Sequence, residues 1–454
     1  MARIAVIDIG KTNAKVLVVD LASGTEDTVA RMPNAVLSSG PYPHHDAEAL
    51  WQFIVDGLGR VGAVRAISIT THGASAALVD AVGDLALPVL DYEHAGPGDL
   101  AADYAAMRPD FAETGSPRLP GGLNLGAQIH WQARTFPEAF ARTRHILTLP
   151  QYWSFRLTGV AASEATSLGC HTDLWNPFQR SFSTLVERQG WRGLFPDVLG
   201  PGAVLGPILP AIAAATGLPP DTPVLSGIHD SNASLVPWLG TDGPRAVLST
   251  GTWMIVMALR GRKVPLDPRR DVLVNVNARG EPVPTARFMA GREVDEITGG
   301  QIVTPPPEVE QAVLVGRQMV LPTLHPDTGP FPGLGLGWAD KPGTPEGVTA
   351  AASFYAALMG AECLSLTGAA GEIIVEGPFA ANQGFLRMLA TASGRPVIAA
   401  GAGAGTGLGA ALLAGPLGHP RRLPAPVQPE TDATWTGYAA DWRMRVYQAW
   451  KAQA

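Results

Sequence analysis

Each half of the chain opens with the same kind of unit, and this repetition constrains the fold more than any other feature of the sequence. Residues 3–20 read as an apolar strand, a small Gly/Thr/Asn turn and a second apolar strand. Residues 246–259 repeat the pattern with a Ser/Thr/Gly turn. Both are typical of β-hairpins whose turns can cradle an anion. Two hairpins can arise by chance, but together they favour an internally duplicated protein with its domain boundary near 238–244.

The segments between and after the hairpins alternate between strand-like and helix-like patterns. The first half contains an apolar strand at 66–72, a helix-like run at 149–159 and a strand at 223–230 that ends in an acid. The second half continues with a helix-like run near 348–366, a strand at 373–377 and a Gly-rich segment before a helix. This alternation predicts an α/β protein with mixed sheets. At 454 residues the chain exceeds one core, so we expect domains at 1–240 and 241–454.

Charge and cysteine content exclude several classes of protein. The net charge is −7 and no block of Lys/Arg occurs, which argues against a nucleic-acid surface. The two cysteines, Cys170 and Cys363, form neither a metal motif nor a disulfide framework and fit a reducing compartment. No secretory pattern precedes the first strand. The uncharged stretch 396–420 is too rich in glycine for a membrane helix, so we expect a cytoplasmic protein without a membrane partner.

The Gly-rich segment 401–415 allows two interpretations. Its glycines could let an adenine or ribose approach the backbone, or they could allow tight helix packing. The segment lacks the strand and the later acid of a dinucleotide-binding fingerprint, and no G-x-x-x-x-G-K-[ST] loop occurs in the sequence. The sequence therefore indicates neither a Rossmann enzyme nor an ordinary P-loop kinase.

Three segments together resemble the FGGY carbohydrate kinases along nearly the whole chain. They are the Asp8-Ile-Gly-Lys-Thr turn, the run 152–159 followed by Glu164-Ala-Thr-Ser, and the run 217–230 that leads into an aspartate. The resemblance implies two ribonuclease-H-like domains of the actin/hexokinase type with a cleft between them. The first domain would mainly bind sugar and the second mainly nucleotide.

Two positions depart from the family pattern, and two segments narrow the substrate. Lys11 stands where the family often has Thr, and residues 376–382 read Glu-Gly-Pro-Phe-Ala-Ala-Asn where a triple glycine is common. The segments 71–75 and 90–94 look closer to the 6-deoxyketose kinases. The resemblance implies transfer of a phosphoryl group from ATP, with Mg²⁺, to a small ketose of the L-fuculose, L-rhamnulose or xylulose type. A homodimer and a monomer both remain open.

The resemblance also implies roles for particular residues. Asp230 would be the general base, although an aspartate there could equally begin a helix. Asp8 would hold Mg²⁺ directly or through its waters, or else form the turn. Trp253 would either flank the site or belong to the core. Candidates for binding ATP are Gly10, Lys11, Thr12, Asn13, Lys15, Gly251, Thr252, Gly377, Asn382 and Gly405, and candidates for binding the sugar are His72, Gly73, Asp91, Glu93, His229 and Asp230.

Two other functions remain open on the same fold. One is a non-kinase ATPase machine of the actin/Hsp70 type, for which we would expect a peptide-binding module after residue 415. The other is a sugar-binding transcription regulator, for which we would expect a helix-turn-helix and a basic face. Neither feature is visible in the sequence.

Overall fold

The computed structural model describes residues 2–240, 243–322, 324–325, 327–401, 405–419 and 422–453. The chain forms two compact units. Unit 1 comprises Met1–Gly240, Val274–Pro282 and Ala404–Pro420, and unit 2 comprises Thr241–Leu273, Val283–Gly403 and Arg421–Ala454. The chain leaves unit 1 at Gly240, inside the predicted boundary 238–244, of which residues 241–242 lie outside the described residues.

Two segments that the sequence analysis assigned to the second domain, residues 274–282 and 404–420, instead cluster with unit 1. For the second segment the physical reason is apolar packing. Leu408 and Ala410 of helix α15 (Gly405–Ala411) lie in one buried cluster with Ile4 and Val6 of strand β1 (Arg3–Ile9). The different roles of the two domains stay predictions.

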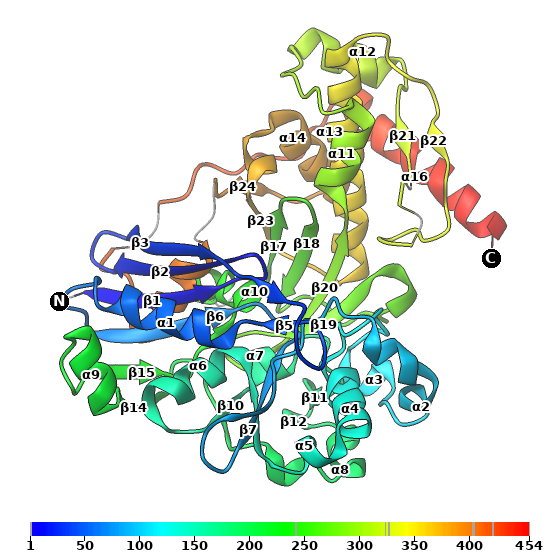
Figure 1. Cartoon of the computed structure of the whole chain (residues 1–454). Helices are drawn as coiled ribbons and strands as arrows, with labels where there is room; N and C mark the ends of the chain where they lie inside the picture. The colour runs from blue at the N-terminus through cyan, green and yellow to red at the C-terminus, as the bar shows by residue number, and fades with distance from the viewer. Residues whose placement is uncertain are drawn as a thin grey trace. The chain divides into compact units, whose positions relative to one another are not determined.

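Unit 1 is built on a mixed sheet (Figure 1) in the order β14-β15-β6-β1-β2-β3, with β16 paired to β6. The predicted hairpin is confirmed, since β1 and β2 pair antiparallel from Arg3–Asp20 to Ile9–Ala14. The strands of this sheet are β1 Arg3–Ile9, β2 Asn13–Asp20, β3 Thr25–Pro33, β6 Ala66–Thr71, β14 Val204–Pro207, β15 Pro223–Leu225 and β16 Ile228–His229.

Both faces of this sheet are buried, because successive side chains of a strand point to opposite sides. Ile4 and Val6 of β1 join the cluster that contains α15, whereas Ala5 and Ile7 join the cluster that contains α1 and α6. The helices of unit 1 are α1 Ala47–Leu58, α2 Ala101–Ala105, α3 Phe111–Thr114, α4 Leu125–Thr135, α5 Pro137–Phe140, α6 Leu149–Thr158, α7 Ala165–Leu168, α8 Thr184–Arg188, α9 Pro210–Thr216, α10 Asp230–Ala233 and α15.

The strand expected at 223–230 is interrupted. It forms two short strands, β15 and β16, separated by Ser226 and Gly227. Gly227 has a φ of +91°, which favours glycine, and a Cβ there would lie 3.0 Å from Pro150. The remaining strands of unit 1 are short: β4 Val36–Leu37, β5 His44–His45, β7 Ala76–Asp80, β8 Leu85–Leu87, β9 Thr143–Thr148, β10 Ser163–Glu164, β11 Trp175–Asn176, β12 Ser181–Phe182 and β13 Val198–Leu199.

Unit 2 is built on a sheet in the order β19-β20-β18-β17-β23-β24. The second predicted hairpin is confirmed, since β17 and β18 pair antiparallel from Arg245–Leu259 to Thr250–Met254. The strands of this sheet are β17 Arg245–Thr250, β18 Met254–Leu259, β19 Val272–Val276, β20 Pro282–Phe288, β23 Glu372–Glu376 and β24 Val397–Ala399, and β21 Val320–Leu321 pairs with β22 Gly337–Trp338 elsewhere.

Five neighbouring strands in one sheet pair in the same pattern as five neighbouring strands in the other. In β3-β2-β1-β6-β15 and in β20-β18-β17-β23-β24, two antiparallel pairings are followed by two parallel ones. Each hairpin thus opens the same five-stranded arrangement. This agreement supports the internal duplication that the sequence suggested.

The core of unit 2 surrounds helix α13 (Pro345–Leu366), which is apolar on all sides and therefore suits a fully buried position. Among the described residues, α13 alone has the length and composition to span a membrane, and 94% of its apolar window is buried within the fold. The other helices of unit 2 are α11 Ala290–Thr298, α12 Pro307–Val315, α14 Gln383–Ser393 and α16 Ala433–Gln453 (Figure 1).

Candidate active site

Asp230 begins the short helix α10, directly after strand β16. Its Oδ1 accepts hydrogen bonds from the backbone N–H of Ser231 at 2.6 Å and from the Ser231 hydroxyl at 3.3 Å. About a quarter of the Asp230 side chain, 27%, remains exposed. Desolvation raises the pKa of Asp230, and the neighbouring His72 and the Ser231 hydrogen bonds oppose that rise. The carboxylate is therefore held in place yet accessible, as a general base requires.

The imidazole of His229 lies beside the Asp230 carboxylate. His229 Nε2 lies 3.2 Å from Asp230 Oδ1, and His229 Nδ1 lies 3.0 Å from Asn232 Nδ2. Burial lowers the pKa of His229 to about 4, so the ring is neutral near pH 7. Because the Asn232 amide donates to Nδ1, the ring proton resides on Nε2, the nitrogen nearer to Asp230. Contact of His229 with the sugar stays a prediction.

Gly73 leaves the room that the His229 ring occupies. A Cβ on Gly73 would lie 2.8 Å from His229 Nε2. A side chain at position 73 would therefore displace the imidazole from its place beside Asp230. The structure gives Gly73 a packing contact with His229, and its contact with the sugar stays a prediction.

A buried carboxylate, Glu164, anchors the backbone beneath His229. Glu164 accepts hydrogen bonds from the Thr166 N–H at 2.8 Å, the Thr166 hydroxyl at 2.5 Å and the Ser167 N–H at 3.2 Å. Thr166 Oγ1 in turn accepts a hydrogen bond from the His229 N–H at 3.1 Å. The Glu164-Ala-Thr-Ser motif seen in the sequence thus supports the strand that carries His229 and Asp230.

We expect Glu164 to make stability depend on pH. Burial raises its pKa to about 7, above the ordinary value of 4.5, although the hydrogen bonds from Thr166 and Ser167 oppose the rise. A raised pKa of the folded state means that its contribution is fully present below about 4.5 and is lost as pH rises through about 7. Glu164→Gln, which cannot ionise, should therefore lose less thermal stability between pH 5 and pH 8 than the wild type. Melting temperatures that fall by the same amount between pH 5 and pH 8 in the two proteins would contradict this assignment.

Asp8 lies at the end of the first strand, with its carboxylate largely buried. Its Oδ2 accepts a hydrogen bond from the Thr406 hydroxyl at 3.0 Å and lies 3.8 Å from Lys15 Nζ. Desolvation raises the pKa of Asp8, Thr406 and Lys15 lower it, and the negative charge of Asp230 raises it further. Asp8 and Asp230 of unit 1 thus interact electrostatically, and a cation near them would offset the repulsion between their charges.

The residues around Asp8 fit a magnesium ion that is completed by other ligands. Among the described residues, no group of three or more His, Cys, Asp or Glu side chains could hold a metal. Mg²⁺ usually takes one or two carboxylates and keeps its waters and substrate phosphates as the remaining ligands. Asp8 by itself can supply the one carboxylate that such a Mg²⁺ ion needs from the protein.

The turn after Asp8 is closed by local hydrogen bonds. The Gly10 N–H donates to Asn13 O at 2.8 Å, and Asn34 Nδ2 donates to Gly10 O at 2.8 Å. Asn13 Nδ2 donates to Thr12 Oγ1 at 3.0 Å, and Asn13 Oδ1 accepts from Arg31 at 3.1 Å. The two asparagines thus fix the turn from either side, and its affinity for phosphate stays a prediction.

Lys11 lies with the sugar candidates, whereas we expected it to add charge to the phosphate-binding turn. Its ammonium forms an ion pair with Asp91, lies 3.5 Å from Glu93 and stacks 4.7 Å from the centre of the Tyr92 ring. The pairing of Lys11 with Asp91 neutralises one charge of the segment 91–93. It also fixes that segment against the first hairpin.

His72 offers one free acceptor to this region. Its Nδ1 lies 2.9 Å from Gly73 O and must carry the proton, because a carbonyl only accepts. Its Nε2 is buried and has no hydrogen-bond partner among the described residues. Desolvation lowers the pKa of His72, so the ring is neutral. The ring centre of His45 lies 5.1 Å from that of His72, and both ring nitrogens of His45 are unpartnered in the described part of the chain. No pattern in the sequence pointed to His45.

In unit 2 the candidate nucleotide residues form a compact set of turns. A Cβ on Gly377 would lie 2.0 Å from Thr250 O, so only glycine permits this approach of β23 to β17. The Gly251 N–H donates to Trp253 O at 3.0 Å, and Thr252 O accepts from the Arg292 N–H at 3.4 Å. An open cavity of about 490 Å³ is lined by Gly377, Pro378, Ala380, Ala381, Ala399 and Gly401.

Three other candidates have local partners. The amide of Asn382 caps helix α14, because Oδ1 accepts from the Phe385 N–H at 2.9 Å and Nδ2 donates to Ser353 Oγ at 2.8 Å. Trp253 stacks 5.0 Å from the Arg287 guanidinium. Gly405 begins α15 in unit 1, next to the Thr406 that bonds Asp8, and not in unit 2 as the sequence suggested.

The Gly-rich segment serves helix packing where it is described. A Cβ on Gly409 would lie 1.8 Å from Ala233 O, so α15 approaches α10 as closely as only a glycine allows. This contact supports the short helix that begins with Asp230. Residues 402–404 of the segment lie outside the described residues.

Comparison with known proteins agrees with this arrangement. Residues 111–237 match the FGGY family of carbohydrate kinases, N-terminal domain, and residues 242–422 match the carbohydrate kinase FGGY, C-terminal domain. The chain belongs to the FGGY family of carbohydrate kinases. The fold predicted from the sequence, two domains of the actin/hexokinase type, is confirmed by this membership.

Individual relatives of this FGGY chain include a solved carbohydrate kinase from Novosphingobium aromaticivorans, 39% identical over 98% of both chains with a TM-score of 0.91. A xylulose kinase from Lactobacillus acidophilus shares the fold at 15% identity, with a TM-score of 0.78 over 100% of this chain and 97% of its own. The L-fuculokinase of Salmonella typhi is 28% identical over 277 residues, which are 57% of each protein. The match thus spans little more than half the length of this curated relative.

Proposed function

We propose that this FGGY protein is an ATP-dependent kinase that phosphorylates a hydroxyl of a small ketose. The observation that carries the proposal is the Asp230 carboxylate, which is partly exposed, accepts two hydrogen bonds from Ser231 and lies 3.2 Å from a neutral His229, while Asp8 lies within electrostatic range. A sugar hydroxyl is a poor nucleophile near pH 7 and needs a carboxylate to accept its proton. Phosphoryl transfer otherwise depends mainly on positioning and on cations near the phosphates.

In the proposed reaction the substrate hydroxyl loses its proton to Asp230 as its oxygen bonds to the γ-phosphorus. The bond between that phosphorus and the bridging oxygen breaks, and ADP leaves with the electron pair. Ser231 keeps Asp230 oriented by donating from its backbone N–H and its hydroxyl. Mg²⁺, which Asp8 would hold, would neutralise charge on the phosphates.

We infer that unit 1 recognises the ketose. The free Nε2 of His72 can accept a hydrogen bond from a sugar hydroxyl, and Asp91 and Glu93 provide further acceptors beside Lys11. Polyols are typically held by such pairs of polar groups. For the nucleotide, the cavity lined by Gly377, Pro378 and four other small residues suits the flat surface of an adenosine.

A panel assay tests the substrate class. ADP release would be measured with L-fuculose, L-rhamnulose and D-xylulose, with glycerol and gluconate as non-ketose controls. We expect the highest kcat/KM for a 6-deoxyketose or for xylulose. Equal rates with and without every ketose would favour the non-kinase ATPase.

A further inference from the structure

A cavity in unit 1 is lined by none of the candidate site residues. It has a volume of about 240 Å³, which is smaller than the usual pocket for a drug-sized ligand. Its walls are the 3₁₀ helix Gly96–Leu100, helix α2, helix α4 and the loop 118–121. The charged side chains in its lining are Arg108 and Arg118, and no Asp or Glu lines it.

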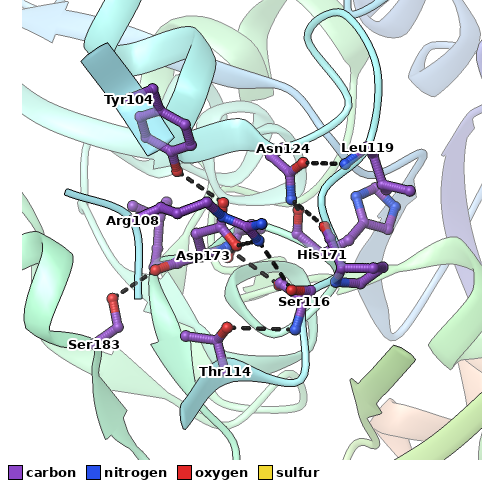
Figure 2. Close-up of polar contacts among 12 residues, drawn as sticks. Tyr104, Arg108, Thr114, Ser116, Leu119, Asn124, His171, Asp173 and Ser183 are labelled. Carbon is purple, nitrogen blue, oxygen red and sulfur yellow. Dashed lines mark hydrogen bonds and ion pairs between the residues drawn. The ribbon is translucent and has the colours of Figure 1, made fainter. Parts of the chain in front are cut away.

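Arg108 is held by Asp173 and Ser116, and its Nε has no hydrogen-bond partner among the described residues (Figure 2). Its Nη2 donates to Asp173 Oδ1 at 2.7 Å and to Ser116 O at 2.9 Å. The hydroxyl of Tyr104 donates to the other oxygen of Asp173 at 2.8 Å. Arg108 Nε is buried and has no partner in the described part of the chain. An unpartnered buried donor costs free energy unless a ligand satisfies it.

Arg118 supplies a positive charge that Asp173 does not offset. Its side chain is exposed, and no hydrogen bond or ion pair joins it to any described residue. With Arg108 paired to Asp173, the cavity wall carries one net positive charge. Two guanidinium groups at one small cavity favour an oxyanion. Arg118 can donate two parallel hydrogen bonds to a phosphate or carboxylate, and Arg108, whose Nη2 is committed, can add a single hydrogen bond from the rest of its guanidinium.

The loop that carries Arg118 is held in place by Asn124 (Figure 2). Asn124 Oδ1 accepts from the Leu119 N–H at 2.8 Å, and Nδ2 donates to Pro117 O at 3.0 Å and to His171 O at 3.1 Å. His171 and Asp173 both have positive φ angles, 43° and 64°, which non-glycine residues rarely adopt. Such strain persists only where the surroundings fix it, and it clusters at functional sites.

Residue 122, at the end of the same loop, contacts one of the segments that we assign to the sugar directly and is joined to the other through Gln128. The Gly122 N–H donates to Tyr92 O at 3.1 Å, between Asp91 and Glu93. Gln128 of α4 donates to Gly122 O and, at 2.6 Å, to Ala74 O in the segment 71–75. A ligand that orders residues 118–122 therefore acts on the backbone of both segments.

We propose that this cavity binds a small metabolite through an oxyanion group, a phosphate or a carboxylate, and that its binding changes the affinity for the ketose. The second part rests on the proposed function. The first part does not, because the cavity contains no residue of the proposed reaction. Reciprocity requires that the ketose change the affinity for the anion by the same factor.

Binding is tested without turnover. Inorganic phosphate and acetate would be titrated by calorimetry at constant ionic strength, with chloride as the reference salt, against the wild type, Arg118→Ala and Arg134→Ala. Arg134, an exposed arginine on α4, is the matched control. We expect Arg118→Ala to weaken binding of the preferred anion by about tenfold, since a hydrogen bond to a charged group is lost. We expect Arg134→Ala to bind like the wild type.

The outcomes separate the two proposals. Equal affinities in Arg118→Ala and the wild type, or no binding beyond that of chloride, would overturn the anion site whether or not the protein is a kinase. For the coupling, the KM for the ketose should change on addition of the anion in the wild type and in Arg134→Ala, and should not change in Arg118→Ala. An anion effect of equal size in all three proteins would overturn the coupling.

Discussion

Asp230→Asn is expected to lower kcat by about 10²–10⁴-fold while binding of ketose and ATP stays nearly unchanged. The amide keeps the shape of the carboxylate but cannot accept the proton of the attacking hydroxyl. The measurement is steady-state kinetics together with calorimetric binding of each substrate. Asp221→Asn, a change at an exposed aspartate nine positions before Asp230, is the control and should leave kcat unchanged. Near-normal turnover of Asp230→Asn would contradict the assignment of the base.

The raised pKa of Asp230 leads to two further predictions, one for the pH dependence of activity and one for the pH dependence of stability. Because the base must be ionised, kcat/KM of the wild type should fall as pH drops through that raised pKa. Because the folded state disfavours the ionised form, the contribution of Asp230 to stability is lost as pH rises. Asp230→Asn should therefore melt no lower than the wild type at pH 8. A marked loss of thermal stability there would indicate a structural role.

Asp8→Ala is expected to raise the Mg²⁺ concentration needed for half-maximal activity by about 10–100-fold, because a metal-holding carboxylate is lost. The measurement is a Mg²⁺ titration of the initial rate at saturating ATP and ketose. Asp27→Ala, at an exposed position of β3, is the matched control and should leave the titration unchanged. An unchanged titration for Asp8→Ala would assign Asp8 to the turn alone.

The hairpins and the alternation of strands and helices were predictable because apolar periodicity and turn residues act locally. The break of the strand at Ser226 and Gly227 was not, since it depends on a positive φ and on the neighbouring Pro150. The position of α15 in unit 1 was equally hidden. It depends on apolar contacts between Leu408 and the first strand, which lie at opposite ends of the sequence.

The candidate site was predictable in its types of residue but not in their pairing. Lys11 and Asp91 are 80 positions apart, and Asp8 and Thr406 are 398 positions apart, so no spacing in the sequence links them. The tautomer of His229 depends on which of its ring nitrogens accepts a hydrogen bond from the Asn232 amide, and only the three-dimensional arrangement reveals this. The family resemblance identified Asp8 and Asp230, and the structure adds the residues that donate hydrogen bonds to them, Thr406 and Ser231.

The most direct test of the kinase proposal follows the γ-phosphoryl group itself. ATP labelled at the γ-phosphate would be incubated with the protein and the best ketose of the panel, and the products would be separated by chromatography. We predict that the label appears in a sugar phosphate in equal amount to the ADP formed, and that little inorganic phosphate is released without ketose. Label found in inorganic phosphate at the same rate with and without ketose would contradict the proposal.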